Sequence, residues 1–133
     1  NEKNIKNYMV VTFDLNNLKM CNDNYGHSSG DAYIIHSAHI IETTFDRFGK
    51  CYRIGGDEFC CLIPDATEFQ IERFIQKMQQ DIAILNNRNI IPTEVGIACG
   101  YALVTPDDTD IEKVRERADD MMYHNKKVLK GFI

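Results

Sequence analysis

The chain has 133 residues, a formal net charge of -5, and apolar and charged fractions of 44% and 26%. This length fits a single domain with one hydrophobic core, and the composition is that of an ordinary globular protein. The negative charge, without any basic stripe interleaved with aromatic residues, argues against nucleic-acid binding. No apolar run approaches roughly 18 residues and no signal-like N-terminus occurs, so we expect this segment neither to contact a membrane nor to be secreted.

Five cysteines are present, an odd number without paired CxxC spacing. This pattern favours reduced thiols in or near the core over disulfides or a zinc site. Reduced thiols in turn indicate a cytoplasmic domain, whose parent protein could still be anchored in a membrane elsewhere. The cysteines are Cys21, Cys51, Cys60, Cys61 and Cys99.

The first element expected is a buried strand over Tyr8–Phe13, because this run is rich in β-branched and aromatic residues. It ends at Asp14, and Leu15–Asp23 follows as polar turn sequence, before Gly30-Asp31. An α/β sheet commonly binds ligands where a buried strand closes on such a turn. Asn22-Asp23 and Gly30-Asp31 are equally typical of helix caps and turns.

A helix is predicted to begin near Ser28 or Ser29 and to stop at Gly49. His36 and His39 are three apart on it, but no third metal ligand accompanies them, so we interpret them as surface or cap residues. Apolar residues at spacings of three and four mark its buried stripe: Ile34, Ala38, Ile41, Phe45 and Phe48.

A β-hairpin follows, formed by Cys51–Ile54 and Phe59–Ile63 around the tip Gly55–Glu58. Glycines let a backbone approach a ligand closely, and adjacent carboxylates can hold a divalent cation through hard oxygen ligands. Gly and Asp also dominate ordinary hairpin loops for conformational reasons. Arg53 is expected to fix the hairpin by pairing with an acid.

A second helix is predicted after Thr67, which forms a capping box with Gln70. Its apolar stripe comprises Ile71, Phe74, Ile75, Met78, Ile82 and Leu85. A strand over Ile97–Val104 and a last helix, capped by Thr109 and Glu112, complete the chain. The buried stripe of that helix is Ile111, Val114, Ala118 and Met121. This order of elements predicts an α/β sandwich.

The polar residues also resemble the motifs of one known family, the GGDEF domains of bacterial diguanylate cyclases. The family patterns D-x-D-x-F-K, N-D-x-x-G-H-x-x-G-D and R-x-G-G-D/E-E-F are matched by Asp14, Lys19, Asn22, Asp23, Gly26, His27, Gly30, Asp31, Arg53 and Gly55–Phe59. Ala98–Ala102 is similar to its S-x-G-x-A strand. Ala118, Asp119, Tyr123 and Lys126 are similar to its A-D-x-x-x-Y-x-x-K helix.

The resemblance implies a palm-like nucleotidyl cyclase fold, with a mostly antiparallel sheet flanked by helices. It implies condensation of two GTP molecules into cyclic di-GMP and two pyrophosphates, by attack of each ribose 3'-hydroxyl on an α-phosphate. Each half-site binds one GTP, so a homodimer is needed. A sensory or regulatory region is expected N-terminal to the domain in the parent protein.

The resemblance also assigns roles to individual residues. Asp14, the Leu15 carbonyl and Asp57 would hold Mg²⁺ (or Mn²⁺), and Asp57 or Glu58 would help deprotonate the attacking hydroxyl. His27 is interpreted as structural, shaping the guanine loop. Phosphate charge would be countered by the backbone amides around Asn17 and Leu18, and by Lys126 and Lys130. Guanine would be read by Asn22 and Asp31, and Gly56 would let the nucleotide lie against the hairpin.

The two lysines also have a simpler interpretation. Lys126 and Lys130 are four residues apart and could form a solvated last turn that complements the helix dipole. Lys130 stands where the family usually has arginine, so it keeps the charge but loses the bidentate geometry.

Three departures from the family pattern bear on activity. Asn16 replaces the second acid of D-x-D and Leu18 its aromatic residue, although Asp14 remains. The family's inhibitory product site would need Arg and Asp where this chain has Asp46 and Gly49, so no such site is expected. The family's opening helix should precede the first strand, so residues 1–133 are expected to be a single-domain fragment of a larger signalling protein. A degenerate module that binds GTP or a partner domain without turnover is the alternative.

Overall fold

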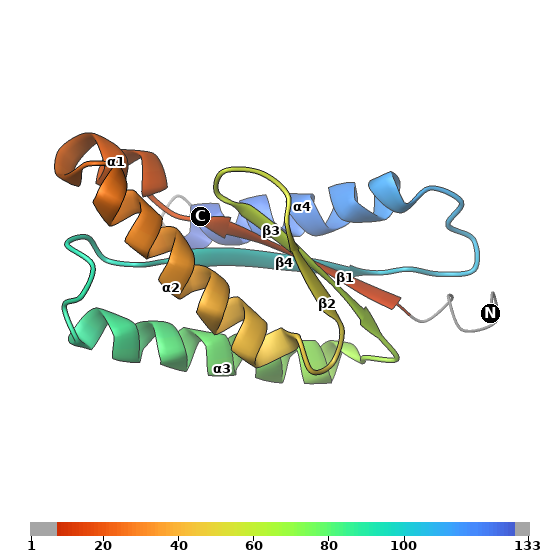
Figure 1. The fold of residues 1–133 in the computed structure, drawn as a ribbon. Coiled ribbons are helices and arrows are strands. Elements are labelled where there is room, and N and C mark those ends of the chain that lie inside the picture. The colour runs from red at the N-terminus through yellow and green to blue at the C-terminus, as the bar shows by residue number, and fades with distance from the viewer. Residues whose placement is uncertain (1–7, 130–133) are drawn as a thin grey trace.

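The computed structural model describes residues 8–129 of the chain, with side chains described to residue 126 (Figure 1). Within this part the chain forms four strands and four helices. In order these are β1 (Tyr8–Leu15), α1 (Leu18–Tyr25), α2 (His27–Phe45), β2 (Lys50–Arg53), β3 (Glu58–Pro64), α3 (Glu68–Asn87), β4 (Ile97–Leu103) and α4 (Ile111–Leu129). None of the described helices is long and apolar enough to cross a membrane.

The strands form one antiparallel sheet in the order β2-β3-β1-β4. The apolar run predicted as a buried strand is the central strand β1, paired with β3 on one side and β4 on the other. In the register, Asp14 lies opposite Glu58 of β3 and Ala98 of β4. The α/β sandwich with a mostly antiparallel sheet is therefore confirmed.

Helices cover both faces of this sheet (Figure 1). On one face, Val11, Phe13 and Cys61 pack in a large core with α1, α2 and α3. Alternate residues of the same strands point the other way, so Val10 and Cys60 pack in a smaller core with α4. Gly100 lets β4 approach α4 closely, since an added Cβ would lie 2.2 Å from the Ala118 carbonyl oxygen.

Several predicted local features are confirmed. The hairpin forms as β2 and β3, and the Thr67–Gln70 capping box begins α3 with both reciprocal hydrogen bonds. The predicted α3 stripe faces the core, although Phe74 and Ile75 stay half-buried.

Other local predictions are wrong. Leu15–Asp23 is not only turn, because α1 begins at Leu18, where Leu18 and Cys21 enter the core. The helix predicted to begin near Ser28 or Ser29 is confirmed as α2, which begins at His27, but it ends at Phe45, before the predicted stop at Gly49. Its buried positions include Tyr33, and Phe48 lies beyond it, 42% exposed.

The α4 prediction also needs correction. Asp110, rather than Thr109, caps the helix, since its side chain accepts the Glu112 N–H. Met122 is buried, whereas Met121 is half-buried and Ile111 is exposed.

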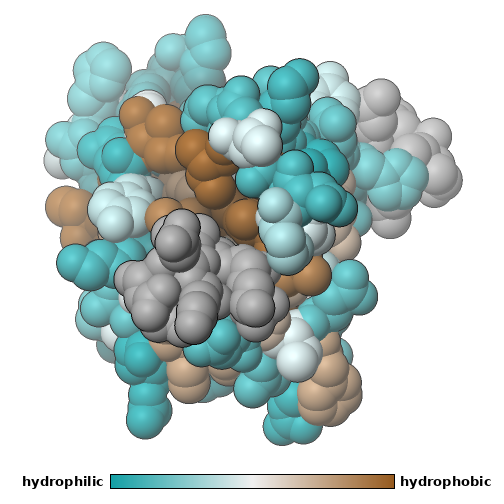
Figure 2. Space-filling model, turned by 90° about the vertical axis from the view of Figure 1, so that its right-hand side faces the viewer, coloured by the Kyte–Doolittle hydropathy of each residue, from teal (hydrophilic) through white to brown (hydrophobic). Residues whose placement is uncertain are grey.

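Apolar side chains are also exposed at the end of the molecule from which α3 and α4 start. Figure 2 shows this end, where brown apolar residues gather among hydrophilic ones. The first turns of the two helices carry Phe69 and Ile111, which are 69% and 52% exposed. This end is opposite the end of the sheet at which β1 stops (Figure 1).

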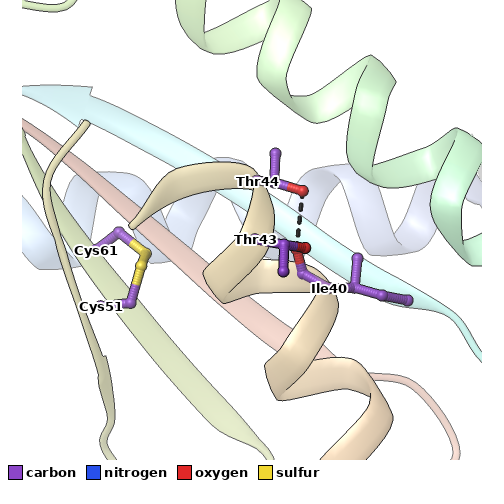
Figure 3. The surroundings of a disulfide bond; sticks show 5 residues. All are labelled: Ile40, Thr43, Thr44, Cys51 and Cys61. Atoms are coloured by element: carbon purple, nitrogen blue, oxygen red, sulfur yellow. Dashed lines mark hydrogen bonds between the residues drawn. A yellow bond between two sulfur atoms is a disulfide. The ribbon is translucent and has the colours of Figure 1, made fainter. Parts of the chain in front are cut away.

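The prediction that all five cysteines are reduced thiols is wrong for two of them. Cys51 and Cys61 form a disulfide between β2 and β3, beside the C-terminal turns of α2 where Thr43 and Thr44 donate to the Ile40 carbonyl (Figure 3). Cys21, Cys60 and Cys99 are buried free cysteines. The physical reason is the hairpin register, which places Cys51 directly opposite Cys61 in the ladder between β2 and β3.

Candidate active site

The C-terminal end of β1 meets the tip of the hairpin. The Leu15 N–H donates to the Asp57 carbonyl at 2.9 Å, which fixes the acidic turn against the strand. Lys126 reaches across from α4, and its Nζ donates to Asp14 Oδ2 at 2.7 Å. Asp14, Asp57 and Lys126, which are far apart in sequence, are therefore brought together here.

Asp14 is held in an environment that disfavours its charge. Burial raises the pKa of this carboxyl, and the nearby Asp57 carboxylate raises it further, while the ammonium of Lys126 opposes both effects. Only Oδ2 has a partner among the described residues, since Oδ1 is buried without a hydrogen bond. An additional cation beside Oδ1 would relieve both the desolvation and the repulsion.

These residues fit a divalent cation. Two adjacent carboxylates and a backbone carbonyl at Leu15 supply hard oxygen ligands, which Mg²⁺ and Mn²⁺ prefer. Within residues 8–126 no group of three His, Cys, Asp or Glu side chains could hold a metal ion by itself. The remaining ligands would therefore come from water or from the phosphates of a nucleotide, as is usual for Mg²⁺.

Glu58 lies on the α4 face of the sheet with a second carboxylate from α4. Burial raises the pKa of Glu58, the Asp119 carboxylate raises it further, and the Arg115 guanidinium lowers it. Asp119 Oδ1 is itself buried without a partner in the described part of the chain, and its Oδ2 lies 3.8 Å from Arg115 Nη1. The sequence identified Asp119 only as a motif residue. Its position beside Glu58 could not be predicted, because Glu58 lies far away in the sequence, on β3.

The turn after β1 leads directly into α1. Asn17 has a left-handed backbone with φ of 61°, and its carbonyl accepts the Cys21 N–H as the helix starts. The amides around Asn17 and Leu18 therefore belong to a helix N-terminus, where unpaired N–H groups attract anions. The phosphate-binding role of these amides stays a prediction, and the Leu18 side chain is buried.

Tyr33, which was not among the predicted site residues, holds this turn through its hydroxyl group. Its buried hydroxyl accepts the Gly96 N–H at 3.0 Å and lies 2.5 Å from the Asn16 carbonyl and 3.1 Å from the Gly96 carbonyl. Burial raises the pKa of Tyr33 to about 12, so the hydroxyl stays a donor. The sequence signal for this role is that Tyr33, with its polar hydroxyl, stands between apolar residues of α2.

The predicted guanine-reading residues lie where α1 and α2 pack together. The Asn22 side chain rests against Gly30, since an added Cβ would lie 1.6 Å from Asn22 Oδ1. Asp31 follows Gly30 and is exposed on α2. The close packing at Gly30 thus places Asn22 beside the turn of α2 that carries Asp31.

Arg53 braces the hairpin tip, but not through an acid as predicted. Its Nε donates to the Gly55 carbonyl at 3.1 Å and its Nη2 to the Gly56 carbonyl at 2.9 Å. A guanidinium suits this role because its donors are held in a rigid fork. Gly56 itself is exposed, and Lys130 lies outside the described residues.

Comparisons with known proteins identify the family of this chain. A family model described as "Diguanylate cyclase, GGDEF domain" matches residues 1–130. Diguanylate cyclase DgcP of Escherichia coli K12 is 30% identical over 120 residues, which is 90% of this chain and 35% of the relative. An uncharacterized membrane protein of Staphylococcus saprophyticus is 31% identical over 129 residues, 94% of this chain and 36% of the relative. The chain thus spans about a third of the length of these curated relatives.

Solved structures share the fold. The GGDEF domain of DgcB from Caulobacter crescentus, in complex with c-di-GMP, gives a TM-score of 0.81 at 22% identity and covers 92% of this chain and 73% of that one. The active GGEEF domain of a diguanylate cyclase from Vibrio cholerae gives 0.79 at 21% identity, with coverages of 95% and 80%.

Proposed function

This chain belongs to the diguanylate cyclase GGDEF domain family, and from that premise we propose that it condenses two GTP molecules into cyclic di-GMP with release of two pyrophosphates. The observation that carries the proposal is the junction of Asp14, the Asp57 turn and Lys126 at the end of β1. Carboxylates and a cation converging from separate elements are what phosphoryl-type chemistry needs.

The acidic side of the junction would hold the metal. Asp14, the Leu15 carbonyl and Asp57 would be its protein ligands, since their oxygens belong to the end of β1 and the turn hydrogen-bonded to it. When bound, Mg²⁺ or Mn²⁺ supplies electrostatic stabilisation of the attacking and leaving oxygens. Glu58 is the candidate that accepts the proton of the ribose 3'-hydroxyl, because its raised pKa suits a base.

The rest of the site would orient the nucleotide. The N-terminus of α1 at Asn17 and Leu18 receives phosphate oxygens, and Lys126, with Lys130, neutralises phosphate charge. Gly56 leaves room for the nucleotide against the hairpin. Asn22 and Asp31 read the guanine edge, where a carboxylate accepts from N1–H and N2–H together and adenine offers no matching donors.

Each domain presents one such site, and closing the product ring needs two nucleotides facing each other. We therefore propose a homodimer as the active form, controlled by a region N-terminal to the domain in the longer parent protein. GTP is a cytoplasmic nucleotide, so we place the domain on the cytoplasmic side.

The decisive experiment measures cyclic di-GMP formed from GTP and Mg²⁺ by the full-length parent protein, as wild type and as Asp57→Ala. Asp107→Ala is the matched control, because Asp107 is an exposed carboxylate on the β4–α4 connection. Product from wild type and control, but not from Asp57→Ala, supports the cyclase. Bound GTP without product in a confirmed dimer would overturn it in favour of a regulatory GTP-binding module.

Asp31→Ala tests base recognition separately. If Asp31 reads guanine, the variant loses much of the preference for GTP over ATP in binding, whereas Asp46→Ala, an exposed carboxylate after α2, keeps it. Unchanged selectivity in Asp31→Ala would remove this residue from the role.

A further inference from the structure

We propose that Cys51 and Cys61 form a reversible redox site that controls how firmly the hairpin holds Asp57 and Glu58. As a disulfide, the pair joins β2 to β3, the two strands that the turn with Asp57 and Glu58 connects. As two thiols it leaves β2 attached by its backbone ladder and by its packing against α2. The proposal depends on the proposed function only for its effect on turnover.

The disulfide lies where it can keep β2 attached to the sheet. This strand lies at the edge of the sheet, and its ladder with β3 comprises four residue pairs, from Lys50 opposite Leu62 to Arg53 opposite Phe59. A short edge strand held on one side frays readily. Cys51 opposite Cys61 is the second pair of this ladder, so a covalent bond there prevents the strand from separating.

β2 and the residue after it supply the groups that hold the acidic turn in place. Arg53 donates to the Gly55 and Gly56 carbonyls, and the Ile54 N–H donates to the Glu58 carbonyl at 2.9 Å. On the other side, the Asp57 carbonyl accepts the Leu15 N–H. Fraying of β2 therefore removes the bonds from Arg53 and Ile54, and the turn is then held mainly from β1.

The exchange chemistry is balanced with an ordinary low-molecular-weight disulfide as oxidant. One cysteine thiol loses its proton, and the thiolate attacks RS–SR to form a mixed disulfide, while the departing RS⁻ takes up the proton as RSH. The second cysteine thiolate then attacks the protein sulfur of the mixed disulfide, and the second RS⁻ leaves and is protonated to RSH in the same way. Two cysteine thiols are oxidised and one RS–SR is reduced. In the reverse direction Cys51, which is half-buried at the sheet edge, is attacked first, because Cys61 is fully buried.

The neighbouring Cys60 does not share this role. It points to the opposite face of the sheet, where it packs with Val10 and α4. Burial raises the pKa of Cys60 to about 11, which keeps it a weakly reactive thiol. Cys60 therefore provides a matched control one residue away from Cys61.

The first test needs no cyclase activity. The full-length wild-type protein, Cys51→Ser and Cys60→Ala are equilibrated either with oxidised glutathione or with reduced dithiothreitol, and are then denatured in the presence of an alkylating reagent. We expect two more alkylated thiols in reduced than in oxidised wild type, the same difference in Cys60→Ala and none in Cys51→Ser. Equal counts in both states of wild type would overturn the proposal.

The second test follows the hairpin itself. Reduction should lower the melting temperature of the wild-type domain by roughly 5–10 °C, as for a disulfide closing a loop of this size. It should also speed amide hydrogen exchange at Ile54. Cys60→Ala should show both changes and Cys51→Ser neither. Identical exchange in both redox states of wild type would overturn the link to the turn.

The third test measures turnover of GTP to cyclic di-GMP. Cyclic di-GMP formation should fall on reduction in wild type and in Cys60→Ala but not in Cys51→Ser. Should the protein form no product in either state, the proposed function fails, while thiol counts and exchange still decide the redox site. Redox-independent turnover in an active wild type would overturn control of the hairpin.

Discussion

The two faces of the sheet differ in the kind of side chain that they carry. The face toward α1, α2 and α3 carries the larger core, in which Phe13 packs edge-on against Phe45 with 5.1 Å between their ring centroids. The face toward α4 has a small apolar cluster around Val10 and Val114, and then charged groups: Asp14, Glu58, Arg115, Asp119 and Lys126. The same strands thus carry most of the apolar core on one side and present ionisable groups on the other.

This difference shows how one antiparallel strand can carry both kinds of side chain. Residues of β1 alternate between faces, so Phe13 and Asp14 are neighbours in sequence but have unrelated roles. Substitutions on the two faces should therefore separate stability from turnover. The following predictions test that separation, starting from the largest expected effect.

Phe13→Ala should cost about 3–5 kcal/mol of unfolding free energy, because it empties a fully buried ring site. Val10→Ala, on the other face of the same strand, should cost roughly 1–3 kcal/mol, because fewer atoms are removed. Urea unfolding measures both. Equal losses would contradict the larger cavity expected at Phe13.

Lys126→Met should lower turnover about 100-fold while changing the unfolding free energy by only about 1 kcal/mol. The ion pair with Asp14 is partly solvated, with side chains 26% and 19% exposed, so its loss matters more for phosphate charge than for folding. Steady-state kinetics and urea unfolding give the two numbers. Lys113→Met, an exposed lysine on the same helix, should change neither.

Gly100→Ala should affect both properties moderately. The added methyl group would meet the Ala118 carbonyl at 2.2 Å and the Met122 nitrogen at 2.3 Å, which forces α4 away from β4. We expect a loss of about 1–3 kcal/mol in stability and a parallel fall in turnover, since Lys126 moves with α4. Ala102→Ser, on the same strand, serves as control in melting and kinetic assays. A stable variant with full activity would show that α4 tolerates the shift.

The smallest effect is a pH dependence. The pKa of Asp14 is raised from 3.8 in the folded state, so the folded protein binds this proton more strongly than the unfolded chain. The Asp14 contribution to stability is therefore greatest below pH 3.8 and is lost as pH rises through the folded pKa, by at most about 1.4 kcal/mol per pH unit. The difference in unfolding free energy between wild type and Asp14→Asn, in metal-free buffer, measures it.

Asp108 provides the contrast of opposite sign. Its hydrogen bond from Arg117 lowers its pKa to about 2, so its contribution is present above pH 3.8 and is lost as pH falls toward about 2. The wild type minus Asp108→Asn difference should thus grow as pH rises from about 2 to 3.8, whereas the Asp14 difference should shrink as pH rises above 3.8. Curves of the same sign would contradict the assignment of a burial-dominated pKa to Asp14.

Much of the fold followed from local sequence rules. The apolar run of β1, the glycine-rich hairpin tip and the Thr67–Gln70 capping box each specify structure through neighbouring residues. Helix α1 was missed because its eight residues contain only two buried positions, Leu18 and Cys21, too few to show a helical period. The error at Ile111 has a related cause, since periodicity does not show where a helix leaves the core.

The site was predicted residue by residue from motifs, but its contacts were not. No local rule links Asp14 to Lys126, 112 residues away, or Tyr33 to Gly96. The disulfide was missed for a similar reason. The predicted hairpin tip Gly55–Glu58 would place Cys51 opposite Leu62, whereas the observed register places Cys51 opposite Cys61.

The central position of β1 has a consequence for synthesis on the ribosome. Its two neighbours are β3 and β4, and β4 ends at Leu103, so the strand made first must wait for most of the described chain before it is enclosed. During that interval Val10–Phe13 is an apolar, β-prone segment with open edges, the kind that pairs with other nascent chains. Translation that pauses before Ile97 should therefore favour aggregation, and chaperone capture of β1 should protect the yield of folded protein.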